Sequence, residues 1–303
     1  KPKFHVAAAQ ALIADVPPLR NELELKRMAM ARLGKQVVDL KGASLRFGDR
    51  VILDDVDWII GPGDRYGIVG ANGIGKTTFL RIIQGLQPLD SGRVKIGQTV
   101  RFAVLSQHLD ELRKLGDDRV RQVISRYSRR TMLDGKEMTP GQLLERLGFT
   151  QEQLWSRIGD LSGGQRRRLQ LMLTLLKEPN VLILDEPTAG LDPAGCRGVL
   201  ENIAAYRRET GSAVLLVTHS MDDAARIADR LIVFHAGHVA FDGAPAEVFA
   251  HTQALLDIGL DVPQAARIAQ ALRDRGVALP PSIYTLEQLT DALLAVGKEA
   301  GVC

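Results

Sequence analysis

The hydrophobic pattern of the chain changes near Val37, where short apolar and β-branched runs begin to alternate with Gly, Pro and Asp. Runs of this length between turn-forming residues are typical of strands, and they occupy residues 37–40, 51–53, 58–60 and 66–69. A glycine-rich loop follows the last run, and the apolar spacing of residues 77–83 predicts a helix that ends at Gly85. The pattern therefore predicts a sheet that leads through a loop into a helix.

Apolar residues at helical spacing, mixed with many charges, run from about residue 109 to residue 178 and predict a helical insert. Two fully apolar runs follow at 181–184 and 214–217, separated by a helix-like segment at 193–210. This alternation is expected of buried parallel strands with helical crossovers. A final hairpin is predicted at 231–241, with Ala236 and Gly237 in its turn. The core is therefore expected to be α/β and to end near Gly243.

Two helices are predicted beyond the core, one from the N-cap Asp261 to Gly276 and one from Thr285 to Gly297. Thr285 and Gln288 have the spacing of a capping box. The second helix carries an apolar stripe that must be buried against the core or another subunit, formed by Leu286, Leu289, Leu293 and Val296. We thus expect a partly helical, linker-like segment at 1–34, a domain at 35–243 and a helical extension at 244–303.

Composition narrows the class of protein. Hydrophobic residues make up 45% of the chain and charged residues 25%, which excludes collagen-like and disordered classes. The net charge of +3 is too small for binding a polyanion by bulk charge. The chain has two cysteines, Cys196 and Cys303, too few for a disulfide framework or a cysteine-based zinc site. No apolar run has the 18 or so residues that cross a bilayer. We therefore expect a cytosolic protein. The missing initial Met is compatible with a chain that begins partway through a longer protein.

The glycine-rich loop, Gly70-Ala71-Asn72-Gly73-Ile74-Gly75-Lys76-Thr77, fits the phosphate-binding loop (P-loop) pattern in its required place between a strand and a helix. Its glycines let backbone N–H groups from Gly73 to Thr78 surround the β- and γ-phosphates of a nucleotide. Lys76 adds a positive charge, and the Thr77 hydroxyl can reach Mg²⁺. An ordinary glycine-rich turn is the alternative, which the strand and helix context disfavours.

Two carboxylates, Asp185 and Glu186, end the apolar run at 181–184. A P-loop site needs an Asp for Mg²⁺ at such a strand end, so Asp185 is the candidate metal ligand. Glu186 points elsewhere and is the candidate general base for the attacking water. Without the P-loop, two acidic residues at a strand end would instead be interpreted as a solvent-exposed turn.

The pentapeptide Leu161-Ser162-Gly163-Gly164-Gln165 completes a set that resembles the nucleotide-binding domain of ABC-type ATPases. The resemblance covers residues 37–243. It implies a P-loop NTPase fold of ABC type, with a mixed-sheet core, an antiparallel β subdomain and a helical subdomain at about 109–178. It also implies ATP and Mg²⁺ as ligands. It assigns Phe47 to adenine stacking, Gln107 to the metal and the helical insert, His219 to the γ-phosphate and water, and residues 189–192 to the loop that follows Glu186.

The same resemblance implies a partner. Ser162 and the glycines after it begin a helix and form a second anion site, and in the family this site closes over the ATP of a second domain. The expected assembly is a head-to-tail homo- or heterodimer around two Mg-ATP, with Ser162, Gly163, Gly164 and Gln165 of one domain facing the P-loop of the other. Hydrolysis removes the bridging charge and opens the dimer.

Two subfamilies are visible in the chain. Residues 1–188 resemble the second ATPase domain of an actinobacterial ABC-F protein, a ribosome-associated class, whereas residues 189–303 resemble the ATPase subunit of an energy-coupling factor (ECF) importer. In the latter family the C-terminal extension helps two subunits to associate. Three alternatives follow: an importer ATPase bound to a transmembrane scaffold at the inner face of the cell membrane, a ribosome-acting ATPase, and a dimerising domain without a productive partner. The basic residues near Arg121 and Arg166-Arg167-Arg168 either contact RNA phosphates or form a solvated helix face.

Overall fold

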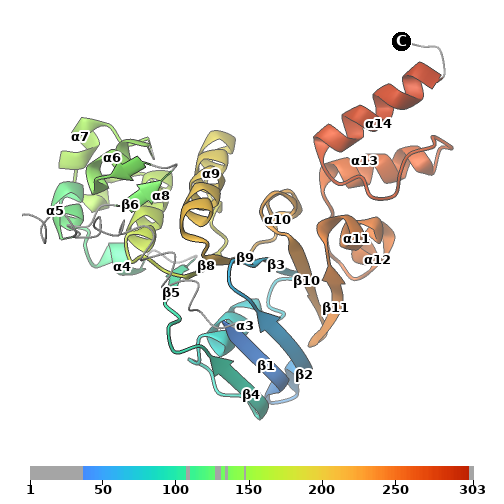
Figure 1. The fold of residues 1–303 in the computed structure, drawn as a ribbon, viewed down its shortest axis with the longest axis horizontal. Coiled ribbons are helices and arrows are strands. Elements are labelled where there is room, and N and C mark those ends of the chain that lie inside the picture. Colours follow the sequence, from blue (N-terminus) through green and yellow to red (C-terminus); the bar gives the residue numbers. More distant parts are fainter. Residues whose placement is uncertain (1–36, 107–109, 127–130, 134–135, 147, 300–303) are drawn as a thin grey trace, which may run out of the picture.

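The computed structural model describes residues 37–106, 110–126, 131–133, 136–146 and 148–299 (Figure 1). Its central sheet has six strands in the order β11-β10-β3-β9-β8-β5. Neighbouring strands are parallel except for β11, which pairs antiparallel with β10 at one edge. The strands are β3 Arg65–Gly70, β5 Phe102–Leu105, β8 Val181–Asp185, β9 Ala213–Val217, β10 Arg230–His235 and β11 His238–Gly243. The predicted α/β core and its final hairpin are therefore confirmed.

A second, antiparallel sheet of order β2-β1-β4 lies below the central sheet (Figure 1). It contains β1 Val38–Phe47, β2 Arg50–Ile60 and β4 Ser91–Ile96. The helix α3, Lys76–Ile83, packs between the two sheets, because the ring of Phe79 lies 5.0 Å from that of Trp58 in β2 and 4.9 Å from that of Phe234 in β10. The P-loop that precedes α3 is thus held by both sheets.

Side-chain alternation along the buried strands separates two layers of core. Val181 and Ile183 of β8 pack in the cluster that contains α3 and the antiparallel sheet. Leu182 and Leu184 pack in the cluster that contains the helices α8, Gly163–Leu175, and α9, Pro193–Thr210. Because successive residues of a strand point to opposite faces, α3 lies on one face of the sheet and α8 and α9 lie on the other. Both faces are covered, which explains why β8 and β9 have no polar alternation.

The insert after β5 is mainly helical, as predicted. It contains the helices α4 Asp110–Arg113, α5 Val120–Ser125, α6 Pro140–Arg146 and α7 Gln151–Trp155, followed by a 3₁₀ turn, η1 Ile158–Asp160, and by α8. A short antiparallel hairpin, β6 Thr131–Leu133 and β7 Lys136–Met138, was not predicted, because strands of three residues carry too little periodicity to be detected.

The helix α9 has the bounds that the sequence predicts. Asp192 caps its start by accepting a hydrogen bond from the Gly195 amide, Pro193 is its first residue, and Gly211 ends it with a φ of 66°. It leads to β9 and then to the short helix α10, Met221–Ile227.

The C-terminal extension contains α11 Pro245–Ala250, α12 Thr252–Asp257, α13 Gln264–Arg273 and α14 Leu286–Glu299. The first two were missed by the sequence pattern. The capping box is confirmed, because the Gln288 amide donates to Thr285 Oγ1 at 3.2 Å and the Thr285 amide donates to Gln288 Oε1 at 3.1 Å. The predicted N-cap Asp261 is wrong: Pro263 occupies that position, and Asp261 Oδ1 instead accepts from the Val262 amide.

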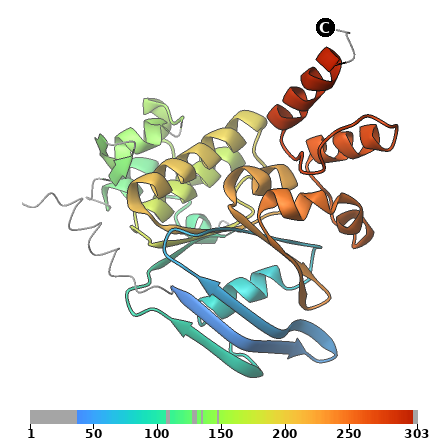
Figure 2. The same ribbon diagram turned by 45° about the vertical axis from the view of Figure 1, so that its right-hand side comes forward.

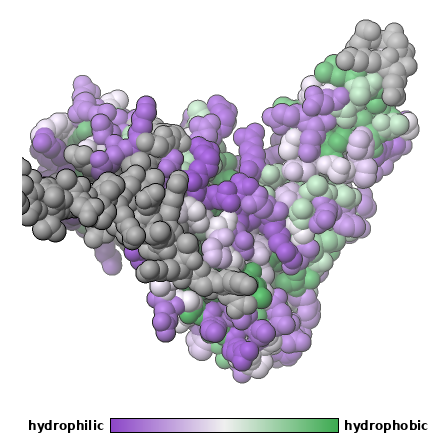
Figure 3. All heavy atoms as spheres, in the orientation of Figure 1, coloured by the Kyte–Doolittle hydropathy of each residue, from purple (hydrophilic) through white to green (hydrophobic). Residues whose placement is uncertain are grey.

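The apolar stripe of α14 is only partly buried. Leu289 is 4% exposed and packs against α13, whereas Leu286 is 68% exposed and Leu293 is 39% exposed. The helices α13 and α14 project away from the sheets (Figure 2), and hydrophobic surface is visible along them (Figure 3). One chain therefore does not cover this face. Within the described residues, no helix is long and apolar enough to cross a bilayer.

A pair of glycine substitutions tests the packing of β4 against β1. Gly92 has a φ of 84°, and a Cβ there would lie 2.1 Å from the Gly42 carbonyl oxygen. Gly92→Ala is expected to destabilise the fold by about 2 kcal/mol or more, seen as a fall of several degrees in Tm by circular dichroism. The control is Gly198→Ala in α9, where a Cβ meets nothing within 4 Å, and it should stabilise by about 0.5–1 kcal/mol. Equal Tm values for the two variants would contradict the described packing.

Candidate nucleotide site

The P-loop joins the carboxyl end of β3 to α3, and its glycines are required by geometry. Gly75 has a φ of 110°, and a Cβ there would lie 2.8 Å from Ile52 Cγ2 of the antiparallel sheet. Gly73 has a φ of 80°, and a Cβ on Gly70 would lie 2.8 Å from the Phe234 carbonyl oxygen. These constraints produce a tight turn at the amino end of α3, the arrangement that favours phosphate binding.

The Lys76 side chain folds back over the loop. Its Nζ donates to the carbonyl oxygens of Gly70 at 2.6 Å and Ala71 at 3.1 Å, and the residue is 8% exposed. Burial lowers the pKa of Lys76, while the charges of Glu186 and Asp185 act in the opposite direction. Both carboxylates are therefore close enough to influence the ammonium group, and the structure brings these three predicted residues into one site. Asn72 and Thr77 are exposed beside it, and Thr78 is half-buried.

Glu186 follows the last residue of β8 and has an unusual backbone. Its φ is 51°, rare for a residue other than glycine, and its amide donates to the Val217 carbonyl at 2.8 Å. The side chain is buried, and Oε2 lies 2.9 Å from Nδ1 of His219 and 3.3 Å from Thr218 Oγ1. Two predicted catalytic residues, Glu186 and His219, are therefore in direct contact. The His219 side chain is 69% exposed, and its Nε2 makes no hydrogen bond to the described residues.

Arg167 was not predicted to belong to the site. It is 4% exposed and lies on the face of α8 that packs against the sheet. Its guanidinium donates to the carbonyl oxygens of Asp185 at 2.8 Å and Pro187 at 3.2 Å, and also to that of Glu186. Further bonds reach the Ser106 carbonyl and Gln170 Oε1. The guanidinium therefore satisfies backbone carbonyls that leave the sheet after β8.

Both sequence alternatives for Arg167, RNA contact and a solvated helix face, are wrong. The sequence gives no sign of this role. Consecutive residues of a helix face different directions, and only the packing of α8 decides which of Arg166, Arg167 and Arg168 is buried. Burial lowers the pKa of the Arg167 guanidinium, and Asp185 and Glu186 oppose that shift.

Ser162 is the N-cap of α8. Ser162 Oγ accepts from the Gln165 amide at 3.2 Å, and Gln165 Oε1 accepts from the Ser162 amide at 2.7 Å, which forms a capping box. The α8 helix lies on the opposite face of the sheet from α3, and residues 162–165 make no hydrogen bond to the described P-loop of the same chain. A Cβ on Gly163 would meet nothing within 4 Å, whereas one on Gly164 would lie 3.2 Å from Leu191 Cδ2. In one chain the P-loop and the pentapeptide 161–165, which we call the signature, therefore lie apart on opposite faces of the sheet.

The remaining predicted residues divide into two groups. Phe47 ends β1 and is 49% exposed, so its side chain is available for stacking. Gln107 and the linker-like segment 1–34 lie outside the described residues.

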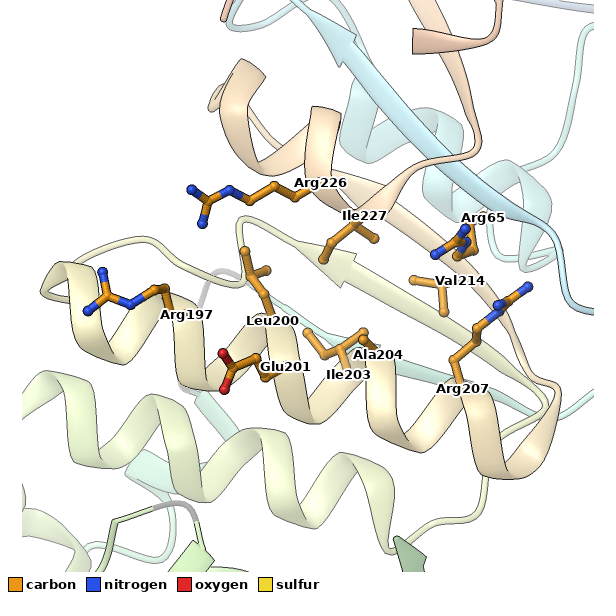
Figure 4. Close-up of a pocket in the computed structure, with 10 residues that line it drawn as sticks. All are labelled: Arg65, Arg197, Leu200, Glu201, Ile203, Ala204, Arg207, Val214, Arg226 and Ile227. Atoms are coloured by element: carbon orange, nitrogen blue, oxygen red, sulfur yellow. The ribbon is translucent and has the colours of Figure 1, made fainter. Parts of the chain in front are cut away.

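A cavity of about 230 Å³ between α9 and α10 is separate from this site (Figure 4). Its apolar side chains include Leu200, Ile203 and Val214, and arginines line its rim. Val214 lies near the amino end of β9, whereas the P-loop and Asp185 lie at carboxyl ends of strands. Ligands of open α/β sheets bind at the carboxyl ends, so this cavity is not the nucleotide site.

The fold and the site together define a P-loop ATPase of the ABC class. The sequence profile of the ABC transporter family matches residues 53–189. The chain is 38% identical over 261 residues to the energy-coupling factor transporter ATP-binding protein EcfA2 of Symbiobacterium thermophilum, with 80% of this chain and 89% of the relative covered. It is 34% identical to the EcfA2 protein of Clostridium perfringens, with 82% and 92% covered. The chain belongs to this family of ABC-type ATPases.

Solved structures agree. The structure of cbiO1 from Clostridium perfringens, described as part of the ABC transporter complex cbiONQ, has a TM-score of 0.61 and 25% identity, and covers 79% of this chain and 100% of its own. A nucleotide-free ATP-binding cassette from an ABC transporter, with a TM-score of 0.54 and 21% identity, covers 69% and 91% and shares the fold.

The similarity to EcfA2 proteins covers more of the chain than residues 189–303. It therefore extends into the part for which the sequence suggested an ABC-F protein. The relatives named here give no support to the ribosome-associated alternative.

The role of Arg167 is tested by replacing it with Met. Arg167→Met keeps most of the side-chain volume but leaves several buried carbonyls without a donor, so the free energy of unfolding should fall by about 3 kcal/mol or more. Its neighbour provides the control, because Arg168 is half-buried and stacks near the ring of Phe149 at 5.8 Å. Arg168→Met should cost less than about 1 kcal/mol. Thermal unfolding measures both, and similar losses would show that Arg167 has no special structural role.

Proposed function

We propose that this chain is the ATP-hydrolysing subunit of a membrane importer of the ECF type, with Glu186 as the general base. The observation that carries the proposal is the buried Glu186 carboxylate, held beside His219 at the sheet edge that also carries the P-loop. The short contact of Oε2 with His219 fixes one side of the carboxylate, and the buried position excludes most competing water.

ATP binds with its triphosphate against the amide groups from Gly73 to Thr78. Lys76 supports this assignment. Its ammonium group donates hydrogen bonds to two carbonyl oxygens of the loop, and from this position it can turn to the β- and γ-phosphates. Gly70 and Gly75 keep the loop tight enough for this approach. The exposed ring of Phe47 stacks on the adenine base.

Mg²⁺ fits the residues that are present. The Thr77 hydroxyl and the Asp185 carboxylate are hard oxygen donors beside the loop, and Mg²⁺ usually binds one or two protein oxygens together with phosphates and waters. That preference agrees with the finding that the described residues form no cluster of three or more His, Cys, Asp or Glu side chains suited to a metal ion. Gln107 is the further ligand that the family resemblance implies. When bound, the ion neutralises charge on the phosphates.

Hydrolysis requires a water molecule between Glu186 and the γ-phosphate. Glu186 accepts a proton from this water as it attacks. His219 Nδ1 donates to the ionised Oε2 of Glu186, so Nε2, which makes no hydrogen bond to the described residues, donates to the γ-phosphate only from a ring that is protonated on both nitrogens.

A second ABC domain completes the site. The signature helix α8 begins with Ser162 and Gly163 on an exposed surface, and the free chain gives no steric reason for a glycine at 163. A phosphate that approaches from another subunit supplies that reason. The uncovered Leu286 and Leu293 face of α14 supports a second contact between ATPase subunits, either two copies of this chain or a related one.

The membrane partner is proposed from the relatives. Their names describe ATP-binding proteins of transporters, and the cbiO1 title describes one part of a larger ABC transporter complex. We therefore place this chain at the cytoplasmic face of the membrane, bound to a transmembrane scaffold subunit. Co-expression of this chain with such a scaffold should give a complex that purifies intact from membranes, and a chain that remains unbound would contradict the importer assignment.

Replacing Glu186 with Gln tests the base. Glu186→Gln should lower kcat for ATP by at least about 100-fold, because the amide cannot accept the proton of the water. ATP binding should persist, and the unhydrolysed nucleotide should trap a dimer that is visible by size-exclusion chromatography with multi-angle light scattering. Glu201→Gln, an exposed change on α9, is the control and should turn over normally. Unchanged kcat in the Glu186 variant would refute the assignment.

Removing the Lys76 ammonium group tests the phosphate site. Lys76→Ala should abolish the rise in Tm that ATP produces in the unmodified protein, a rise equivalent to about 2.7 kcal/mol when ATP is present at 100 times its Kd. Lys95→Ala changes an exposed lysine of β4 and should keep the full rise. A retained ATP-dependent shift in Lys76→Ala would place the nucleotide elsewhere.

A further inference from the structure

The segment between β9 and α10 is attached to the residues after β8 by a chain of hydrogen bonds that centres on Thr218. This residue is 0% exposed, and it lies directly before His219. Its hydroxyl oxygen accepts from the Ser220 amide at 3.0 Å and lies 3.3 Å from Glu186 Oε2. A side chain with two polar contacts and no access to solvent has a defined orientation.

The direction of the second bond follows from the chemistry of a hydroxyl. An ionised carboxylate has no proton to donate, so the Thr218 O–H must be the donor to Glu186 Oε2. Because Thr218 is fully buried, water does not compete for that proton. His219 Nδ1 approaches the same Oε2 at 2.9 Å. One carboxylate oxygen is therefore held twice, and the other, Oε1, has no hydrogen bond within the described residues.

Further bonds hold this arrangement from both ends. Ser220 Oγ accepts from the Asp223 amide at 3.2 Å and caps α10, and Asp223 Oδ2 accepts from Thr188 Oγ1 at 2.7 Å. The Glu186 amide donates to the Val217 carbonyl. The loop that carries Thr218 is thus fixed to the backbone on either side of Glu186, so Thr218 cannot easily follow the carboxylate to another rotamer.

A simpler interpretation is that the Thr218 hydroxyl only forms a local turn with Ser220. That role needs the hydroxyl oxygen as an acceptor and leaves the hydroxyl proton unused. A buried donor without an acceptor is costly, and the nearby Glu186 carboxylate removes this cost. The turn and the contact with Glu186 are therefore made together.

We propose that Thr218 is a positioning residue for the reaction: its hydroxyl holds Glu186 Oε2 so that Oε1 faces the attacking water. The inference rests on the proposed role of Glu186 as general base. Thr218 itself contacts neither ATP nor water, and it acts through the rotamer of the carboxylate. Nothing in the P-loop depends on this bond, so nucleotide binding should be independent of it.

The experiment compares Thr218→Val with Thr218→Ser. Valine has the shape of threonine without the hydroxyl, and serine keeps the hydroxyl. Thr218→Val should lower kcat by about 10- to 100-fold, because a misplaced catalytic group costs rate without affecting ground-state binding. KM for ATP and the ATP-induced rise in Tm should stay near those of the unmodified protein. Thr218→Ser should restore kcat to within about threefold.

Thr174→Val is the matched control. Thr174 is 3% exposed, and its hydroxyl donates to the Gln170 carbonyl at 2.7 Å within α8. This variant also loses a buried hydroxyl, and it should keep its kcat. Circular dichroism melting of each variant identifies any loss of folding. If Thr218→Val is too unstable to assay, the comparison of Thr218→Ser with Thr218→Ala at a temperature below both melting transitions replaces it, with the same expected split between kcat and KM.

A double-mutant cycle separates this inference from the proposed function. If Glu186 is the base and Thr218 acts through it, adding Thr218→Val to Glu186→Gln should cause no further loss of turnover. Normal kcat in Thr218→Val, or a serine variant as slow as the valine variant, would overturn the positioning role even while Glu186→Gln remains inactive. Normal turnover in Glu186→Gln would instead overturn the assignment of the base itself.

Discussion

The guanidinium of Arg167 is the contact on which the catalytic edge depends. Where β8 ends, three consecutive carbonyl groups leave the ladder of the sheet inside the protein, and Arg167 donates hydrogen bonds to all of them. Water could not satisfy these groups at a buried position. With that backbone fixed, Glu186 adopts a positive φ, and its side chain contacts His219. Arg167 thus holds the backbone of the residues that we propose for catalysis.

The division of the core into two layers explains why the P-loop and the signature lie apart in one chain. The strands β8 and β9 bury alternate side chains against α3 on one face and against α8 and α9 on the other. The P-loop therefore belongs to one layer and the signature at Ser162 to the opposite layer. Each lies at the N-terminus of a helix, and each is formed by local capping and glycine geometry. The rigid sheet keeps them apart, so a nucleotide that uses both must lie between two subunits, as proposed.

The exposed apolar face of α14 is consistent with membership of a family of transporter ATPases. The chain covers about nine tenths of the EcfA2 relatives. In this chain α14 leaves Leu286 and Leu294 strongly exposed. Exposed apolar residues grouped on one helix are characteristic of interfaces. The same chain therefore has two surfaces suited to partners, one built around the phosphate chemistry and one built from apolar side chains.

The sequence alone determined the features that depend on local backbone preference. The P-loop followed from glycine spacing, α9 from the helix-like pattern of residues 193–210, and the capping box of α14 from Thr285 and Gln288. Only the tertiary structure decided which charged groups are buried and what they contact. Arg167 is buried although it has the same side chain as Arg166 and Arg168, and Thr218 is fully buried although the sequence does not distinguish it from other threonines. Leu289 is buried, whereas Leu286 of the same apolar stripe is exposed. Burial depends on the element that packs opposite, and that element is distant in the sequence, so no local pattern can specify it.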